Sequence, residues 1–128
     1  MSTPLYEMKA EFFKTLGHPA RIRVLELLSE REYAVAEMLP EVGIEASRLS
    51  QQLAVLRRAN LVAVSRREGS TVYYTLTSPR VADLLAVARG ILTGLLTDQV
   101  GLLEDLRAAT PGASPATATA DGSGSSPC

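Results

Sequence analysis

Hydrophobic side chains recur three or four residues apart in five stretches of the chain, and this spacing predicts five amphipathic helices. The clearest stretch is the fourth, where Leu49, Leu53 and Leu56 form one apolar stripe. In the third stretch, Pro40 is expected to kink or end the helix, because proline lacks the amide hydrogen that the helix needs. The five predicted helices cover residues 5–15, 19–29, 34–39, 46–59 and 80–107.

After the fourth helix the hydrophobic pattern changes to a period of two, which predicts a β-hairpin. Residues 61–67 and 71–76 both alternate in this way, and Gly69 between them can adopt a positive φ angle. Residues 30–33 are expected to form a polar turn, and Gly43 suits the tight corner between the two helices of a helix-turn-helix. The predicted fold is therefore mainly α with a small β-hairpin, of the winged helix-turn-helix type.

The face of the fourth helix opposite its leucines is polar and carries no acidic side chain. Hydroxyl, amide and guanidinium groups of this kind donate hydrogen bonds to phosphates and to base edges in a DNA major groove. Arginines near the hairpin tip suit a neighbouring phosphate run or minor groove, although a solvated hairpin with ordinary surface arginines is the alternative. The predicted DNA contacts are Ser47, Arg48, Ser50, Gln51, Gln52, Arg57, Arg58, Arg66, Arg67 and Ser70.

The net charge of −1 over 128 residues argues at first against a nucleic-acid partner. However, five arginines and no carboxylate lie between residues 46 and 67. Because local potential attracts phosphate, double-stranded DNA remains the expected partner. The length suits one domain, residues 1–107, followed by an Ala/Thr/Pro/Gly/Ser-rich tail, residues 108–128, that is expected to be disordered.

The last predicted helix has a broader apolar face than a small core can cover. Together with the first helix, it is expected to form a homodimer across a two-fold axis. The alternative is a long helix that folds back on its own core. The predicted interface residues are Leu5, Met8, Phe12, Val81, Leu85, Ala88, Leu92, Leu95, Leu102 and Leu106.

Motifs for catalysis and for membrane insertion are missing from the sequence. There is no Gly-rich phosphate loop and no Gly-x-Ser-x-Gly elbow, so we predict no catalytic residue and no enzyme. The sole histidine, His18, is expected to cap a helix or lie on the surface, and the sole cysteine, Cys128, cannot form an internal disulfide. No apolar run reaches the ~18–20 residues of a membrane span and no signal-peptide pattern opens the chain, which predicts a cytoplasmic protein without a membrane partner.

Five segments of the chain together form a recognisable pattern. They are LGHPARIRVL (16–25), EMLPEVGI (37–44), SRLSQQLAVLR (47–57), ANLV (59–62) and RREGSTVYYTL (66–76). With these segments, residues 12–77 resemble the ArsR/SmtB family of winged helix-turn-helix repressors from bacteria. The resemblance implies a homodimer that binds an operator near its own promoter and releases it when an inducer, often a metal ion, binds.

The metal-sensing part of the family pattern is missing. Thiolate-sensing members carry Cys-x-Cys where this chain has Ala34 and Ala36, and no histidine follows His18. We therefore assign no metal ligand and find no evident cofactor, leaving open only a metal ion at a non-standard site. Two functions remain: a sequence-specific repressor that binds an inverted-repeat operator as a dimer, or a protein-interaction subunit whose sensing is supplied by a partner protein or co-repressor.

Overall fold

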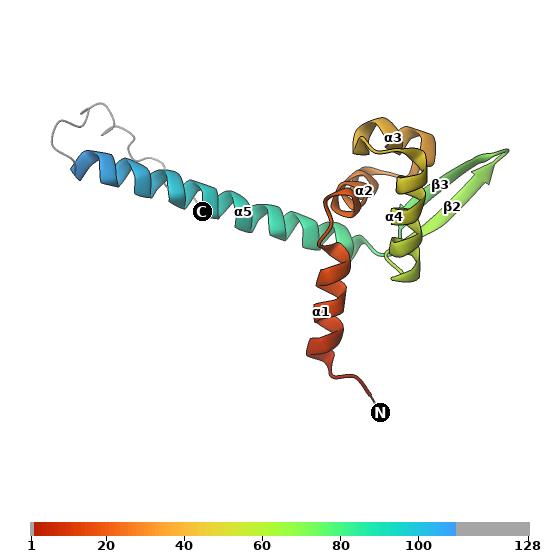
Figure 1. The fold of residues 1–128 in the computed structure, drawn as a ribbon, viewed down its shortest axis with the longest axis horizontal. Helices are drawn as coiled ribbons and strands as arrows, with labels where there is room; N and C mark the ends of the chain where they lie inside the picture. Colours follow the sequence, from red (N-terminus) through yellow and green to blue (C-terminus); the bar gives the residue numbers. More distant parts are fainter. Residues whose placement is uncertain (1, 110–128) are drawn as a thin grey trace. The chain divides into compact units, whose positions relative to one another are not determined.

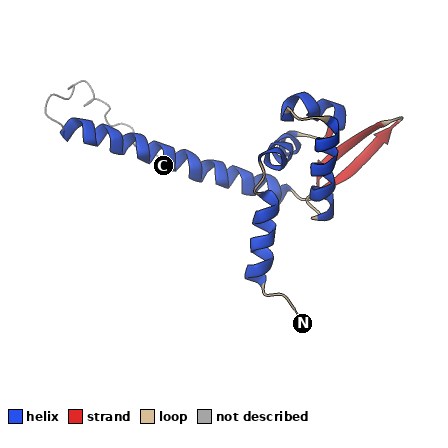
Figure 2. Ribbon diagram, in the orientation of Figure 1, coloured by secondary structure: helices blue, strands red, loops and turns tan. Residues whose placement is uncertain are grey.

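The computed structural model describes residues 2–109, which form five helices and a three-stranded sheet (Figures 1 and 2). These residues divide into two units, residues 2–85 and residues 86–109, and each is described by itself. The elements in chain order are α1 (Leu5–Leu16), α2 (Pro19–Glu30), β1 (Tyr33–Ala34), α3 (Val35–Val42), α4 (Ala46–Arg58), β2 (Val62–Glu68), β3 (Thr71–Leu76) and α5 (Pro79–Ala109).

The predicted elements form with small shifts at their ends. All five helices and the hairpin are present, which confirms the predicted mainly α fold with a small β-hairpin. The last helix continues to Ala109, two residues into the stretch that was predicted to be a disordered tail. Residues 110–128 of that tail, including Cys128, lie outside the described residues.

The sheet is antiparallel with the strand order β1-β3-β2. The short strand β1 corrects the prediction of a polar turn at residues 30–33, because Tyr33 is buried and pairs with Tyr74. Two residues are too few to show a period-two pattern, so this strand exists only through its pairing with β3. In the hairpin, Gly69 has a φ of 62°, and the register shifts between Val64 and Arg66, which leaves Ser65 as a bulge.

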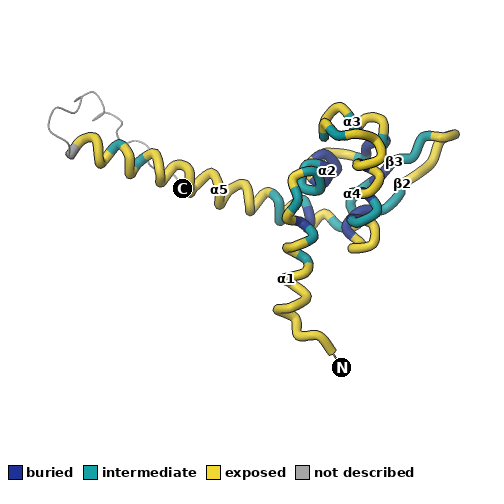
Figure 3. Tube along the Cα trace, in the orientation of Figure 1, coloured by how far each residue is buried: buried dark blue, intermediate teal, exposed yellow. Residues whose placement is uncertain are grey.

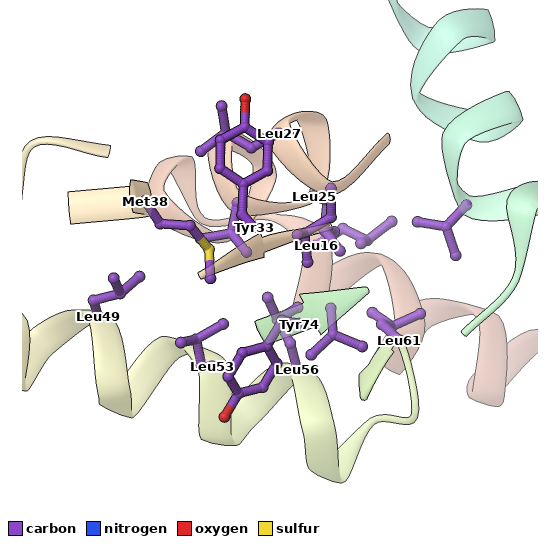
Figure 4. Packing of buried hydrophobic residues seen from close by; sticks show 14 residues of the cluster. Leu16, Leu25, Leu27, Tyr33, Met38, Leu49, Leu53, Leu56, Leu61 and Tyr74 are labelled. Atoms are coloured by element: carbon purple, nitrogen blue, oxygen red, sulfur yellow. The ribbon is translucent and has the colours of Figure 1, made fainter. Parts of the chain in front are cut away.

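One hydrophobic core joins the elements of residues 2–85 (Figure 4). In α4, Leu49, Leu53 and Leu56 point into this core, as the leucine stripe predicted. Each fully buried leucine contributes roughly 1.5–3 kcal/mol relative to an exposed one. Burial of these leucines therefore determines which face of α4 remains in solvent. The other core residues are Leu16, Val24, Leu25, Leu27, Leu28, Tyr33, Met38, Leu61, Val62, Tyr74 and Val81.

The third helix does not end at Pro40, which was one of the two predicted outcomes; it continues to Val42. Capping hydrogen bonds stabilise both ends of this longer helix. The Glu37 carboxylate accepts one from the backbone N–H of Ala34 at 2.8 Å, and the backbone N–H of Gly43 donates one to the Leu39 carbonyl at 2.9 Å. The contact with Ala34, followed by the one with Arg31, lowers the pKa of Glu37. Gly43 has a φ of 76° and makes the left-handed turn that leads into α4.

Candidate nucleic-acid interface

The polar face of α4 points away from the core. Ser47, Arg48, Ser50 and Gln51 are all exposed, and we call these four residues the polar face. Within residues 2–109, the side chains of Arg48 and Gln51 have no hydrogen-bond or ion-pair partner, so their donors and acceptors are free for a ligand. The structure thus presents the first four predicted contacts on α4 as one solvent-facing group.

Gln52, the fifth predicted contact on this helix, is held within the protein. It is half-buried, and its Oε1 accepts a hydrogen bond of 2.7 Å from Nε of Arg21 in α2. Arg21 also donates from Nη1 to the backbone carbonyl of Thr15, at 3.0 Å. Its link to Gln52 spans 31 residues, and no local pattern predicts a contact at that separation.

The β2–β3 hairpin, which we call the wing, lies beside α4 (Figures 1 and 2). At its exposed end Arg67 makes no ion pair or hydrogen bond within the described part of the chain. Arg57 and Arg58 at the end of α4 are likewise exposed and unpaired among these residues, as is the Ser70 hydroxyl. These arginines and Arg48 form a set of cations without a carboxylate partner among the described residues.

Arg66 differs from Arg67, the other arginine of the wing, because it already has partners. Its Nε donates to the Glu32 carboxylate at 2.7 Å, its Nη1 pairs with Glu68, and its guanidinium lies 3.7 Å from the centre of the Tyr73 ring. Glu32 also accepts a hydrogen bond of 2.7 Å from the Ser65 hydroxyl. The bonds from Ser65 and then Arg66 lower the pKa of Glu32, and Glu32 in turn raises the pKa of Arg66. The Arg66 side chain therefore contacts the wing and the residue just before β1.

A cleft of about 420 Å³ lies between the start of α2 and the first turns of α4. The polar-face residue Arg48 and Gln52 both line it, so the cleft is continuous with the proposed interface. At its edge His18 acts as a cap, as predicted, because its Nδ1 accepts a hydrogen bond from the Ala20 N–H at 3.1 Å. The remaining lining residues are Pro19, Ala20, Arg23, Glu41, Val42 and Ile44.

Many residues of α1 and of α5, each helix taken by itself, are exposed (Figure 3), and large apolar residues are among them. Among the predicted dimer residues, Leu5, Met8, Leu92, Leu95, Leu102 and Leu106 are each between 54% and 64% exposed, and Ala88 is exposed as well. Seven more exposed large apolar residues within residues 2–109 were not among the predicted interface residues: Tyr6, Phe13, Val87, Ile91, Leu96, Val100 and Leu103.

Three of the predicted dimer residues contact the core of residues 2–85. Val81 is only 7% exposed and belongs to the core of residues 2–85, while Phe12 and Leu85 pack against that core. Helical spacing marks an apolar face but does not say which part of it the same chain covers.

Neither a metal site nor a membrane-spanning helix is found among the described residues. Residues 2–109 contain no group of three or more His, Cys, Asp or Glu side chains placed to hold a metal ion. None of the helices among them is long and apolar enough to cross a membrane.

Comparison with known proteins identifies the family. Residues 18–64 match the family model described as "Bacterial regulatory protein, arsR family". The HTH-type transcriptional regulator Rv0081 of Mycobacterium tuberculosis is 60% identical over 108 residues, which is 84% of this chain and 94% of that protein. The chain belongs to the arsR family of bacterial regulatory proteins. It is a DNA-binding transcriptional regulator and not an enzyme, which confirms both predictions.

Solved structures of other proteins share this fold. The crystal structure of Rv0081 has a TM-score of 0.70 and 59% identity, covering 77% of this chain and 99% of that one. A homodimeric winged helix-turn-helix DNA-binding domain from Mycobacterium bovis has a TM-score of 0.64 and 30% identity, over 72% of this chain and 84% of its own. The transcriptional repressor BigR from Xylella fastidiosa has a TM-score of 0.59 and 34% identity, over 70% and 88% respectively. These likenesses confirm the winged helix-turn-helix fold, while the expected co-repressor or sensor protein stays a prediction.

Proposed function

We propose that this protein is a homodimeric repressor that binds an inverted-repeat DNA operator. The observation that carries the proposal is the exposed polar face of α4 next to a wing whose Arg67 has no ion-pair partner among the described residues. An α-helix of this kind fits a major groove, and a β-ribbon beside it reaches the adjoining backbone. A regulator that acts on DNA in this way works in the cytoplasm of a bacterium.

The side chains divide into two classes by their chemistry. On α4, the amide and hydroxyl groups of Ser47, Ser50, Gln51 and Gln52 suit base edges, with Arg48 able to pair with guanine. The remaining cations suit phosphates, which fix the register and position of the protein but carry little sequence information. These phosphate contacts are Arg57, Arg58 and Arg67, with the Ser70 hydroxyl as a neutral donor.

The dimer follows from apolar surface that residues 2–109 leave uncovered. Leu92 and Leu95 on α5 and Leu5 and Met8 on α1 are more than half exposed, which is costly for side chains of this size in water. A second copy that covers them is favoured by the same hydrophobic effect that drives folding. The homodimeric relative from Mycobacterium bovis supports this assembly. A two-fold dimer would present two copies of α4 to half-sites about one helical turn apart.

Binding measurements over a range of salt concentrations test the proposal. The protein first selects its preferred duplex from a randomised library, and binding to this duplex and to random DNA is then compared. Replacing Gln51 and Gln52 by alanine should cut the preference for the selected duplex at least about tenfold and leave the salt dependence unchanged. Arg67→Ala should weaken both duplexes alike and lower the slope of log affinity against log salt by about 0.9.

Lys9→Ala is the matched control, because Lys9 is an exposed cation on α1, a different helix from the one that carries the polar face. It should change neither the preference nor the slope. If the Gln51/Gln52 variant loses affinity equally for selected and random DNA, α4 does not read sequence and the proposal is wrong.

A further inference from the structure

Arg21 joins three helices through its guanidinium group. Its Nε donates to Oε1 of Gln52 on α4 at 2.7 Å, and its Nη1 donates to the carbonyl of Thr15 near the end of α1 at 3.0 Å. Arg21 has no carboxylate partner within residues 2–109. Its charge therefore strengthens two hydrogen bonds to neutral oxygens. The planar guanidinium is held at two points, so its direction is set by α1 and α2 rather than by α4 alone.

This contact determines how Gln52 presents its amide. A guanidinium only donates hydrogen bonds, so the Gln52 atom that faces it must be the carbonyl oxygen, and the amide nitrogen must face elsewhere. The last torsion of a free glutamine side chain is broad and roughly two-fold, so its oxygen and nitrogen exchange places readily. Gln51, without such a contact within the described residues, keeps that freedom.

Gln52 and Arg21 are both half-buried, but only Gln52 lines the cleft next to the polar face. Arg48 of the polar face lines the same cleft. A duplex that reaches this part of α4 meets the Gln52 amide before the guanidinium. Arg21 can therefore influence DNA recognition without touching DNA.

We propose that Arg21 is a specificity-determining positioning residue that acts through Gln52. This rests on the proposed function, since it assigns one base preference to the same interface. Because the Gln52 carbonyl is hydrogen-bonded to Arg21, the side chain offers DNA the two hydrogens of its amide nitrogen. These suit the major-groove acceptors of guanine, adenine or thymine. Cytosine displays only an N4 donor there, and the Gln52 carbonyl that would accept from it is directed at Arg21. The protein therefore disfavours cytosine at the base position that Gln52 faces. Without Arg21, the Gln52 amide can rotate so that its carbonyl accepts a hydrogen bond from cytosine N4.

Selection from a randomised duplex library, followed by sequencing, tests this for the full chain and its variants. The unmodified protein should show one position per half-site where cytosine is depleted about fivefold or more. Arg21→Ala and Gln52→Ala should each reduce the depletion there to less than about twofold. Adding Arg21→Ala to Gln52→Ala should cause no further change at that position, because the arginine acts only through the amide.

Two measurements separate positioning from other roles. The slope of log affinity against log salt should be the same for Arg21→Ala as for the unmodified protein, whereas loss of a phosphate contact would lower it by about 0.9. Arg23→Ala is the matched control: Arg23 is on the same helix and lines the cleft, but it pairs with Glu26 and Glu41 and makes no bond to Gln52. It should leave the cytosine depletion intact.

If Arg21→Ala does not fold, Arg21→Met retains an apolar stem without donors and carries the same expectation. A lower salt slope, or unchanged cytosine depletion in the folded variant, would overturn the inference and leave the proposed function standing. If the unmodified protein selects no sequence at all, the proposed function itself fails.

Discussion

Arg66 shows how the surroundings of one residue change the role that its charge suggests. The sequence pattern groups it with Arg67 as a phosphate contact, but its guanidinium already contacts Glu32, Glu68 and the Tyr73 ring. Glu32 lies 34 residues before it, so the contact ties the wing to the segment before β1. We therefore infer that Arg66 holds the wing in place and that Arg67 contacts the phosphate backbone of DNA.

The pH dependence of folding tests this anchor. The pKa of Glu32 lies below its ordinary value of 4.5 in the folded protein, because the Ser65 hydroxyl and Arg66 stabilise its carboxylate. A carboxyl group with a depressed pKa contributes its full stabilisation above the ordinary value and loses it as the pH falls through the folded value. Glu32→Gln should therefore melt at a lower temperature than the unmodified protein at pH 7, and the gap should close as the pH falls below 4.5.

Melting curves at stepped pH measure that gap. Glu11→Gln is the control, since the Glu11 carboxylate makes no ion pair or hydrogen bond within residues 2–109, and it should show no pH-dependent difference. A gap for Glu32→Gln that stays constant from neutral to acid pH would contradict the proposed anchor.

Among the elements, the turn from α3 to α4 determines where the polar face points. Gly43 has a φ of 76°, a left-handed conformation that costs a residue with a Cβ about 1–2 kcal/mol. No atom lies near the position that a Cβ would take, so this cost comes from the backbone and not from crowding. Gly43→Ala should thus lower the free energy of unfolding by about 1–2 kcal/mol, measured by denaturant unfolding.

Gly17→Ala is the matched control at the end of another helix. Gly17 has a φ of −78°, which alanine adopts readily, and a Cβ there would make only ordinary contacts. Gly17→Ala should lower the free energy of unfolding by less than half as much as Gly43→Ala does. Equal losses at the two glycines would mean that the turn before α4 does not need the left-handed conformation.

The elements also differ in how far the sequence predicts them. The leucine stripe of α4 and the alternation of the wing are repeated signals, and both elements form where these patterns indicate. The strand β1 has two residues and no repeat, and Pro40 carries a strong local signal that the caps of α3 override. Local periodicity thus predicts long elements well and short ones poorly.

For the whole molecule, the exposed leucines of α5 carry the prediction of a dimer. Each leucine buried at an interface contributes roughly 1.5–3 kcal/mol, so placing charges at both Leu92 and Leu95 should weaken association at least about a hundredfold. We expect the Leu92→Glu/Leu95→Glu variant to sediment as a monomer at concentrations where the unmodified protein is a dimer. Its affinity for a duplex with two half-sites should fall towards its affinity for one with a single half-site.

Thr97→Glu adds a charge to the opposite face of the same helix, where Thr97 is exposed, and should leave the dimer intact. Should the double variant remain a dimer, or should the unmodified protein sediment as a monomer, this face of α5 is not the interface.

The sequence by itself determined the helices, the wing and the polar character of α4, because each depends on spacing between near neighbours along the chain. It also indicated the family, through motifs that lie within one element or across one turn. Only the tertiary structure decided which of these polar groups are free. In the folded protein, Arg21 donates a hydrogen bond to Gln52, Arg66 pairs with Glu32, and Val81 is buried in the core. Such contacts join residues brought together by the packing of several elements, and no repeat along the chain encodes them.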